Sequence, residues 1–342
     1  MAQQTSAHNQ HLTLADIARQ TNYSISTVSK VLNDQSDISP EAKERVNAVL
    51  TASGYRRKSR QHRHQEFIDI VFSSFSNLWA FEVVKGALNT ASQHDIRITI
   101  TESGDRNHPA ENWASDLVRR HPLGAVLVFS HLSTREREEL DKNDIFYSIF
   151  DPSGEPEPQD FSVRADNWNG GMLAARHLAD LGHQRIAMIT GPEVMLSARA
   201  RTEGFIAALA DRNISFNPAL KREGDFTMVS GLREGLELLN LPAQERPTAI
   251  FAGNDLQAMG VYEAARQVGL RIPQDLSVVG FDDLQTSSFM NPPLTTISQP
   301  LQQMAGIATQ MVINRANHEH SDMHVVLPTS LIERESTARP QN

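Results

Sequence analysis

The chain has 342 residues, more than one ordinary hydrophobic core accommodates, so we expect a small domain joined to a larger one. Apolar residues make up 39% of the chain and charged residues 21%, which is typical of a folded protein and excludes a largely disordered one. The sequence contains no cysteine, which excludes disulfides and thiolate metal sites, and its net charge of −9 argues at first against nucleic-acid binding.

The charge is distributed unevenly along the chain. Residues 1–66 contain nine Lys and Arg but six Asp and Glu, a net +3, which leaves −12 on the remaining residues. A basic N-terminal part (residues 1–66, the head) and an acidic remainder (the body) indicate that only the head contacts the phosphates of a nucleic acid. Residues 1–11 are polar and lack a signal-peptide core, and no apolar run approaches the roughly 20 residues of a membrane span. We therefore expect a disordered arm over 1–11 and a cytoplasmic protein that does not contact membranes.

Three short amphipathic helices are predicted between residues 12 and 55. Thr13 is the expected N-cap of the first helix, and Asn22 suits the left-handed turn that follows it. Ser24 is the expected cap of the second helix, Ser39 before a proline opens the third, and Gly54 ends it. The apolar faces consist of Leu14, Ile17 and Ala18, of Val28, Val31 and Leu32, and of Ala42, Val46, Val49 and Leu50.

The exposed side of the second predicted helix favours DNA binding. The first two helices are joined by a very short turn, which is typical of a helix-turn-helix. A solubilising surface would carry Glu and Lys, whereas short polar groups can approach base edges closely. The residues on this side are Ile25, Ser26, Thr27, Ser29, Lys30 and Asn33. A purely structural three-helix bundle is the alternative.

From Phe67 onward, short apolar runs alternate with helical patterns, which predicts a doubly wound parallel α/β sheet. The predicted strands are Ile68–Ser73, Ile96–Thr101, Gly124–Phe129, Ile145–Phe150, Arg185–Thr190, Thr248–Ala252 and Ser277–Phe281. The predicted helices include Trp79–Ser92, Trp168–Leu181, Ser197–Arg212, Ser230–Leu239 and Leu256–Val268. Gly182, Gly269 and Pro273 mark returns from helix to strand, and Asp151–Asp160 is predicted to be a loop.

Polar residues follow several of the predicted strands, and ligands of such sheets lie at the carboxyl ends of strands. Asp151 follows one strand, and the pairs Asn254-Asp255 and Asp282-Asp283 follow two others. A single carboxylate in this position is commonly a helix cap, and we interpret Asp255 and Asp283 in this way.

The remaining strand-end groups predict a pocket for a neutral polyol. Carboxylates accept hydrogen bonds from vicinal hydroxyls, Arg201 and asparagine donate them, and aromatic faces cover the C–H surface of a sugar ring. Trp79 and Phe226 are the candidate aromatic residues, Ser73 is a further polar candidate, and Glu82 is a weaker one.

Two runs in the head, Thr13–Ala18 and Ser26–Asn33, carry a long and specific signature. They closely resemble the N-terminus of the lactose-repressor (LacI/GalR) family. The resemblance implies that the second helix enters the major groove of a near-palindromic operator, with Ile25, Ser26 and Lys30 at the principal specificity positions. It also implies that Thr27, Ser29 and Asn33 bond phosphates or fix the register, supported by the backbone near Ser39. The expected DNA contacts are Thr13, Ile25, Ser26, Thr27, Ser29, Lys30, Asn33, Ser39, Tyr55, Arg56, Arg57 and Lys58.

The tether over residues 56–66 departs from the family pattern. The family usually has a proline-containing hinge helix that ends in a leucine, which enters the minor groove. Here the proline is missing, His64 stands where the leucine is expected, and five cations lie between Arg56 and Arg63 without an acid. We predict a tether that is disordered without DNA and binds phosphates and a narrow minor groove; a solvated linker is the alternative. Alanine at Arg56, Arg57 and Lys58 is expected to flatten the salt dependence of operator binding.

The body carries further blocks that look like the same family. They are Leu181–Ala187, Gly191-Pro192, Ser197–Phe205, Gly224–Phe226, Ala252–Asp255, Val278–Asp283 and Pro292–Ile297. The resemblance implies a fold like that of a periplasmic sugar-binding protein, with two lobes joined by three crossovers. It implies effector contacts at Asp151, Arg201, Asn254, Asp282 and Gln299, a stacking position at Phe226 and a structural role for His183. The expected organisation is an arm over 1–11, a helix-turn-helix over 12–55, a tether over 56–66 and an effector-binding and dimerisation domain over 67–338.

We therefore expect a homodimeric repressor of carbohydrate-utilisation genes that a sugar or oligosaccharide releases from operator DNA, without a cofactor or metal. A purine or other small molecule acting as corepressor is one alternative. A transport protein shares the body's fold, but it would carry a signal peptide where the head stands. An enzyme is disfavoured because the sequence lacks G-x-G-x-x-G, P-loop, G-x-S-x-G and H-E-x-x-H motifs. The chain ends soon after Ile332 without a leucine-heptad tail, so we expect no tetramer of that kind.

Overall fold

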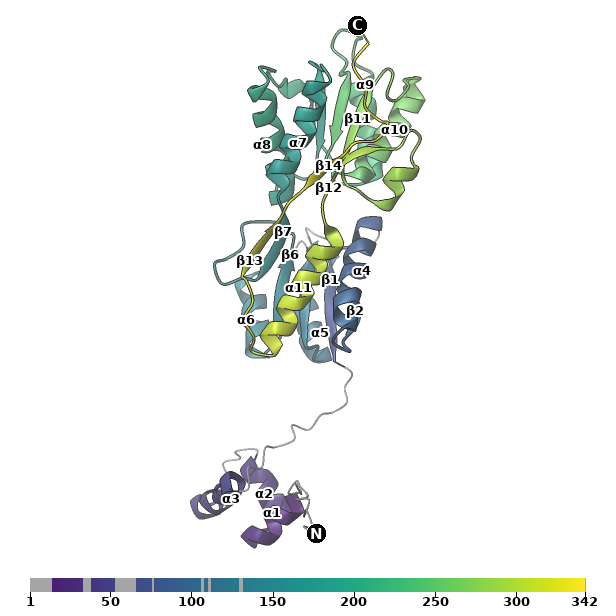
Figure 1. Cartoon of the computed structure of the whole chain (residues 1–342). Helices are drawn as coiled ribbons and strands as arrows, with labels where there is room; N and C mark the ends of the chain where they lie inside the picture. The colour runs from purple at the N-terminus through teal and green to yellow at the C-terminus, as the bar shows by residue number, and fades with distance from the viewer. Residues whose placement is uncertain are drawn as a thin grey trace, which may run out of the picture. The chain divides into compact units, whose positions relative to one another are not determined.

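The computed structural model describes residues 14–32, 38–52, 66–75, 77–105, 108–109, 112–128 and 132–341. These residues fall into two compact units, Met1–His64 and Gln65–Asn342 (Figure 1). Within the described segments, no helix combines the length and apolar character that crossing a bilayer requires.

The first unit is a three-helix head made of α1 (Leu14–Thr21), α2 (Ile25–Leu32) and α3 (Pro40–Ala52). Asn22 takes the left-handed conformation in the short turn, with φ of 64°, as predicted. Ser24 and Ser39 cap α2 and α3: their hydroxyls accept from the backbone N–H of Thr27 (3.0 Å) and Ala42 (3.3 Å). The predicted cap Thr13 and the predicted helix stop Gly54 lie outside the described residues. The core of the head contains Ile17, Ala18, Val28, Val31 and Val46.

The second unit consists of two lobes, each built on a six-stranded sheet. In lobe 1 the strands are β1 (Phe67–Phe72), β2 (Arg97–Glu102), β5 (Gly124–Val128), β6 (Phe146–Phe150), β7 (Ser162–Ala165) and β13 (His324–Leu327). They pair in the order β13-β7-β6-β5-β1-β2 and all pairs are parallel. A small hairpin of β3 (Gly104–Asp105) and β4 (His108–Pro109) follows β2.

In lobe 2 the strands are β8 (Ile186–Thr190), β9 (Lys221–Glu223), β10 (Ala249–Ala252), β11 (Ser277–Asp282), β12 (Thr295–Ser298) and β14 (Ser330–Ile332). They pair in the order β14-β12-β11-β10-β8-β9, and β14 is antiparallel to β12 while the other pairs are parallel. Every residue of β8 and β10 is buried, as expected for strands of a sheet that helices cover on both faces.

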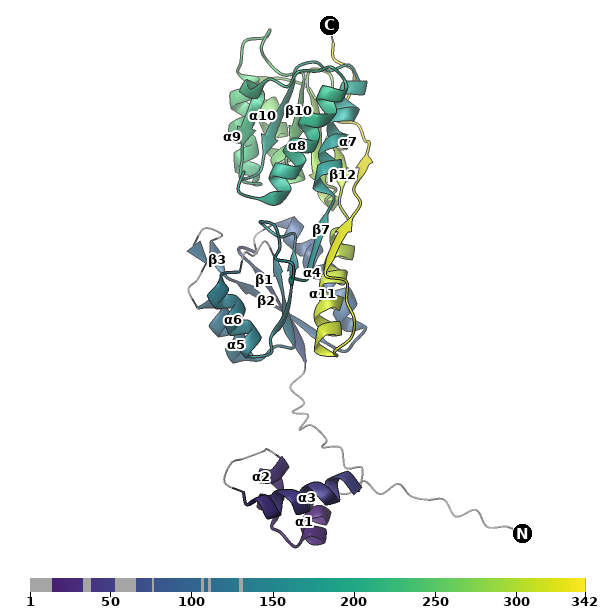
Figure 2. The ribbon, with the colours of Figure 1, turned by 90° about the vertical axis from the view of Figure 1, so that its left-hand side faces the viewer.

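Helices cover both faces of each sheet (Figures 1 and 2). In lobe 1, α4 (Leu78–Ser92) and α11 (Leu301–Ala316) cover one face and α5 (Trp113–Arg120) and α6 (Thr134–Lys142) the other. In lobe 2, α7 (Asn167–Asp180) and α8 (Leu196–Asp211) lie on one face and α9 (Met228–Leu239) and α10 (Asp255–Val268) on the other. Two short 3₁₀ turns, η1 (Pro218–Leu220) and η2 (Gln285–Phe289), complete lobe 2. The fold class expected from the sequence is therefore confirmed.

The chain passes between the lobes three times. It leaves lobe 1 after β7, returns through β12 into α11, and crosses again between β13 and β14. Two strands of the connecting region, β7 and β13, lie side by side in parallel, although 162 positions separate their paired residues Ser162 and His324. The crossovers join the two lobes, and the cleft described below lies between the lobes, at the carboxyl ends of their strands.

Two glycines let α7 and α8 approach each other closely. A Cβ at Gly171 would lie 2.0 Å from the carbonyl oxygen of Arg201, and one at Gly204 would lie 1.9 Å from that of Trp168. Larger residues at these positions would force the helices apart. The contact fixes Arg201 on α8 relative to the start of α7, which matters for the site.

Candidate functional site

The exposed side of α2 is the candidate nucleic-acid surface of the head. Ile25, in the first turn, leaves 53% of its surface in solvent, and Ser26 next to it is also exposed. Ser29 and Lys30 are half-buried on the same helix. Ile25 is not part of the core cluster of the head, so its exposed side chain suits contact with another surface.

Two of the expected DNA contacts also hold the head together. The Thr27 hydroxyl lies 2.8 Å from that of Ser24, within the cap of α2, and Ser39 caps α3. The expected contacts Thr13, Asn33, Tyr55, Arg56, Arg57 and Lys58 lie outside the described residues.

The second candidate site is a cavity of about 100 Å³ between the two lobes. It is lined by Asn77, Trp79, Asp151, Ser197, Arg201, Asp225, Phe226, Thr227, Asn254 and Asp282. Asn77 and Trp79 stand at the start of α4 and Asp151 directly follows β6, so lobe 1 supplies three of these residues and lobe 2 the others. Beside the cavity, Leu256 and Leu284 of lobe 2 pack into the apolar core of lobe 1, where Trp79 meets Phe150 edge to face.

Arg201 is the one cation among the described residues that line this cavity, and it is almost completely buried at 4% exposure. Its Nε donates to Oδ1 of Asn167 (2.8 Å) and its Nη1 to the carbonyl of Gly253 (2.6 Å). The guanidinium lies 3.6 Å from the ring centre of Phe281. Burial lowers its pKa, while Asp282, Asp151 and Asp255 oppose the shift; arginine stays protonated at neutral pH. The structure therefore holds a fixed positive charge in the floor of the cavity.

Asp282 ends β11 and faces Arg201 in the cavity. It is 3% exposed, and its Oδ1 accepts a hydrogen bond from Nε2 of Gln299 (2.6 Å). Burial raises its pKa well above the usual range, and the charge of Arg201 opposes that shift. Gln299 does not line the cavity itself, and its Oε1 is buried without a hydrogen-bond partner. Gln299 thus orients the carboxyl group of Asp282, and its own Oε1 is left as an unused hydrogen-bond acceptor.

Asn254 joins two parts of the cavity wall. Its Oδ1 accepts from the N–H of Gln257 (2.9 Å) and caps α10, while its Nδ2 donates to the carbonyl of Phe226 (3.1 Å). Phe226 has a φ of 65°, a conformation that is strained for a bulky residue, and its ring centre lies 5.6 Å from the guanidinium of Arg201. The side-chain amide of Asn254 thereby fixes both the start of α10 and the backbone that carries the Phe226 ring.

The two carboxylates interpreted as helix caps have other roles, so that interpretation was wrong. Asn254 caps α10, and Asp255 instead accepts hydrogen bonds from the Leu284 N–H and from the hydroxyls of Ser287 and Thr296. Burial raises the pKa of Asp255 to about 6. Asp283 forms an ion pair with Arg334 at 2.6 Å. Both carboxylates connect distant segments of lobe 2, which sequence position alone does not reveal.

Two other candidates are not among the described residues that line the cavity. Ser73 is half-buried just after β1, and Glu82 accepts a hydrogen bond from Nε2 of Gln302 (2.5 Å) on α11. Conversely, five residues of the site were not predicted: the lining residues Asn77, Ser197, Asp225 and Thr227, and Asn167, which holds Arg201. The strand-end rule could have found Asp225, which follows β9 by two residues.

His183 is a structural residue of lobe 2. It is 1% exposed, and its ring nitrogens lie within 3.0 Å of the Thr248 and Ser277 hydroxyls and of the Ala338 carbonyl. Burial lowers its pKa to about 4, so the ring is neutral in the folded protein. Among the described residues, no three histidines or carboxylates are grouped so that they could hold a metal ion.

Comparison with known proteins gives a consistent assignment for both units. Residues 13–58 match the family described as "Bacterial regulatory proteins, lacI family", and residues 175–337 match a "Periplasmic binding protein-like domain". The ribose operon repressor of Escherichia coli K12 is 30% identical over 308 residues, which are 89% of this chain and 92% of that protein. The transcriptional repressor PurR of Aliivibrio fischeri MJ11 is 28% identical over 318 residues, 92% of this chain and 94% of that protein.

Solved structures of similar fold cover nearly the whole chain. A complex of the transcriptional regulator CelR with cellobiose matches with a TM-score of 0.73 and 29% identity, over 95% of this chain and 99% of that one. The lac repressor dimer bound to operator and the anti-inducer ONPF matches with a TM-score of 0.70 and 27% identity, over 96% and 100%.

Proposed function

The chain belongs to the lacI family of bacterial regulatory proteins, and on that premise we propose that it is a DNA-binding transcriptional repressor that a neutral sugar releases from its operator. The observation that carries the sugar assignment is the convergence of Asp151, Arg201, Asn254 and Asp282 on one cavity between the lobes.

The chemistry of the cavity favours an uncharged, hydroxyl-rich ligand. The described lining contains three carboxyl groups, those of Asp151, Asp225 and Asp282, and one guanidinium, so an anionic ligand would meet more oxygen acceptors than cationic donors. An apolar ligand would displace water from these groups and leave them without partners. Hydroxyl groups both donate and accept, which matches carboxylates, amide and guanidinium together, while Trp79 and Phe226 offer apolar faces to the ring.

Binding of operator DNA is assigned to the head. Ile25, Ser26 and Lys30 on α2 would read bases in the major groove, and the basic residues of the tether would contact phosphates. The lac repressor structure named above contains operator DNA, which supports this assignment.

A homodimer fits both the operator and the surface of the second unit. Leu78, Phe81 and Leu88 on α4 and Ile100 on the edge strand β2 are each more than 40% exposed. A lone subunit would leave this apolar surface in water, whereas a second copy would cover it. The similar lac repressor structure is a dimer, and a two-fold dimer places two heads on a near-palindromic site.

Release from DNA is proposed to follow a shift between arrangements of the two lobes. The cavity takes residues from both lobes, so a ligand that bonds all of them stabilises the arrangement in which they converge. The change in operator affinity cannot exceed the difference in ligand affinity between the two arrangements. We assign the chain no catalytic role, since the relatives named above are transcriptional repressors, and we propose that it acts in the cytoplasm.

A purine corepressor is the second candidate, because PurR is among the similar proteins. The excess of carboxylates in the cavity favours the sugar, since a purine presents fewer vicinal donors to them.

The test is operator binding by the full chain with and without ligands. An operator is selected from a random DNA pool, and its dissociation constant is measured with ribose, cellobiose, glucose 6-phosphate or hypoxanthine. A neutral sugar is expected to weaken operator binding by about five- to 150-fold, the range of ordinary coupling energies, and glucose 6-phosphate to have no effect. Tighter binding with hypoxanthine would replace the inducer proposal with the corepressor one. Failure to select any operator would refute the repressor function.

A further inference from the structure

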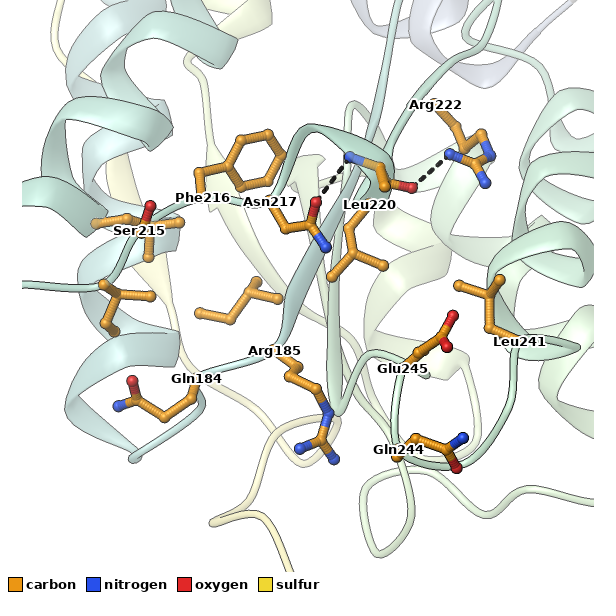
Figure 3. Close-up of a pocket in the computed structure, with 14 residues that line it drawn as sticks. Gln184, Arg185, Ser215, Phe216, Asn217, Leu220, Arg222, Leu241, Gln244 and Glu245 are labelled. Carbon is orange, nitrogen blue, oxygen red and sulfur yellow. Dashed lines mark hydrogen bonds between the residues drawn. The ribbon is translucent and has the colours of Figure 1, made fainter.

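A second cavity, of about 400 Å³, lies in lobe 2 at the amino-terminal ends of β8, β9 and β10. It is separate from the cleft, whose lobe-2 residues stand at the opposite, carboxyl ends of these strands. Its volume falls within the range of about 300–1,000 Å³ that is typical of small-molecule sites. Figure 3 shows its walls.

The floor of this second cavity is apolar. Ile186 at the start of β8, Leu209 near the end of α8, Ile214 and Leu220 are all buried, with at most 6% exposure. Phe216 adds an aromatic ring, which is held edge to face against Phe205 at 5.9 Å. The floor can therefore cover a branched or aromatic side chain, and the T-shaped pair fixes the position of one wall.

Opposite charges stand at the rim without neutralising each other. The Nε of Arg185 donates to the carbonyl of Arg246 (3.0 Å), which places the guanidinium beside the backbone that carries Glu245. Both Arg185 and Glu245 line the cavity and are exposed. Within the described part of the chain, no ion pair joins them, and the Arg185 side chain uses its Nε but neither terminal guanidinium nitrogen in a hydrogen bond. The side-chain amides of Gln184 and Gln244 border the same space.

We propose that this cavity is a second small-molecule site, which binds a zwitterionic α-amino acid with an apolar side chain. The carboxylate of the ligand bonds the guanidinium of Arg185, its ammonium group bonds the carboxylate of Glu245, and its side chain lies against Ile214, Leu220 and Phe216. A simple carboxylic acid would leave Glu245 without a partner, and a simple amine would leave Arg185 without one. A zwitterion can form an ion pair with both side chains.

The test uses the full chain with labelled Ile and Leu methyl groups, titrated with L-phenylalanine and followed by NMR. L-phenylalanine is expected to shift the methyl signals of Ile186, Ile214 and Leu220 in the second cavity. The signals of Leu256 and Leu284 beside the cleft are expected to stay unchanged. 3-Phenylpropionate, which lacks the ammonium group, and 2-phenylethylamine, which lacks the carboxylate, are each expected to bind about fivefold more weakly, the size of an exposed ion pair.

Two substitutions assign the charges. Glu245→Gln is expected to lower the affinity for L-phenylalanine to that for 3-phenylpropionate and to leave the binding of 3-phenylpropionate unchanged. Arg185→Gln is expected to lower the affinity for L-phenylalanine to that for 2-phenylethylamine and to leave the binding of 2-phenylethylamine unchanged. The matched controls Arg119→Gln and Glu138→Gln, on the surface of lobe 1, are expected to change neither affinity.

Absence of shifts at the cavity methyls, or equal affinities for all three probes, would overturn the proposal. The proposal does not depend on the sugar assignment, because the cleft and the second cavity have different reporter methyls and different probes.

Discussion

Replacement of Asp282 by asparagine tests the effector site with little disturbance of the fold. Asp282 has a φ of 114°, a region that most side chains rarely adopt and that asparagine tolerates better than alanine does. The amide keeps one oxygen, which can still accept the 2.6 Å hydrogen bond from Gln299. The substitution therefore replaces one carboxyl oxygen at the cavity face by an NH2 group, which cannot accept a hydrogen bond, while it keeps the shape of the side chain.

The magnitude follows from the hydrogen bonds that the carboxylate can make. Removing the partner of a buried hydrogen-bond donor costs about 1–3 kcal/mol, and 1.4 kcal/mol corresponds to a tenfold change in affinity. Loss of one such bond from a sugar hydroxyl to Asp282 should weaken effector binding by about 10- to 100-fold. The head belongs to the other compact unit, so operator affinity without effector should stay as in the wild type.

The assay combines calorimetric titration of the effector with operator binding in its presence. The expected variant keeps wild-type operator affinity but needs the correspondingly higher effector concentration for release. Asp180→Asn, an exposed carboxylate of α7 that pairs with Arg212 at 3.0 Å, is the control and should behave like the wild type. Effector affinity within threefold of wild type in Asp282→Asn would refute the placement of Asp282 in the site.

Three further substitutions probe the fold itself. Burial raises the pKa of Asp255 to about 6, so between about pH 4 and 6 the folded protein keeps this proton while the unfolded chain releases it. The resulting stabilisation of about 3 kcal/mol is present below pH 4 and is lost as the pH rises through 6. This pH dependence should disappear from urea unfolding measured on Asp255→Asn. Gly204→Ala places a Cβ 1.9 Å from the carbonyl oxygen of Trp168 and should lower the free energy of unfolding of the second unit by about 2 kcal/mol in the same assay. Ser24→Ala removes the cap of α2, a loss of about 1 kcal/mol, and should speed amide exchange in α2 about fivefold.

Each of these has an outcome that contradicts it. A wild-type pH profile in Asp255→Asn would show that this carboxyl group is not the one that holds the proton. Gly154→Ala, where an added Cβ has no atom within 4 Å, is the control for Gly204→Ala and should leave stability unchanged; equal effects of both would contradict the helix-contact argument. Ser26→Ala should not speed exchange in α2, and unaltered exchange in Ser24→Ala would mean that the cap contributes nothing.

Those parts of the fold that depend on local signals could be predicted from the sequence. Caps and a left-handed asparagine delimit the head helices, and fully buried strands such as β8 are recognisable as short apolar runs. The edge strands β9 and β14 were missed because they are three residues long, and β9 reads Lys-Arg-Glu, with no apolar pattern. Helix α6 is not among the helices named from the sequence, for a related reason: eight of its nine residues lie outside the core and only Leu140 is buried. Such elements owe their conformation to the neighbours that they pair with or pack on.

Site residues could be predicted where a motif or the end of a strand marks them. They could not be predicted where the role of a residue depends on a partner that is distant in the sequence. Asp151 directly follows β6, Asn254 follows β10 by two residues and Asp282 ends β11, so a topological rule selects them. Asn167 has no such mark, since its role is to accept from Arg201, which is 34 positions away. The misinterpretation of Asp255 has the same origin: Asn254 occupies the cap position, and only the tertiary fold brings Ser287 and Thr296 to the carboxylate.

Backbone strain gives an independent reason to place function at the cleft. Ten described residues other than glycine have a positive φ, and three of them, Asp151, Phe226 and Asp282, line this one cavity. Aspartate tolerates the conformation, but phenylalanine does so at a cost of about 1–3 kcal/mol, which persists only where the surroundings enforce it. Here they do: Nδ2 of Asn254 holds the Phe226 carbonyl, and the ring occupies space that a Cβ at Gly191 would need, 2.0 Å away. A residue without this strain could satisfy packing alone. We therefore interpret the strained turn as the feature that directs the aromatic face of Phe226 toward the cavity.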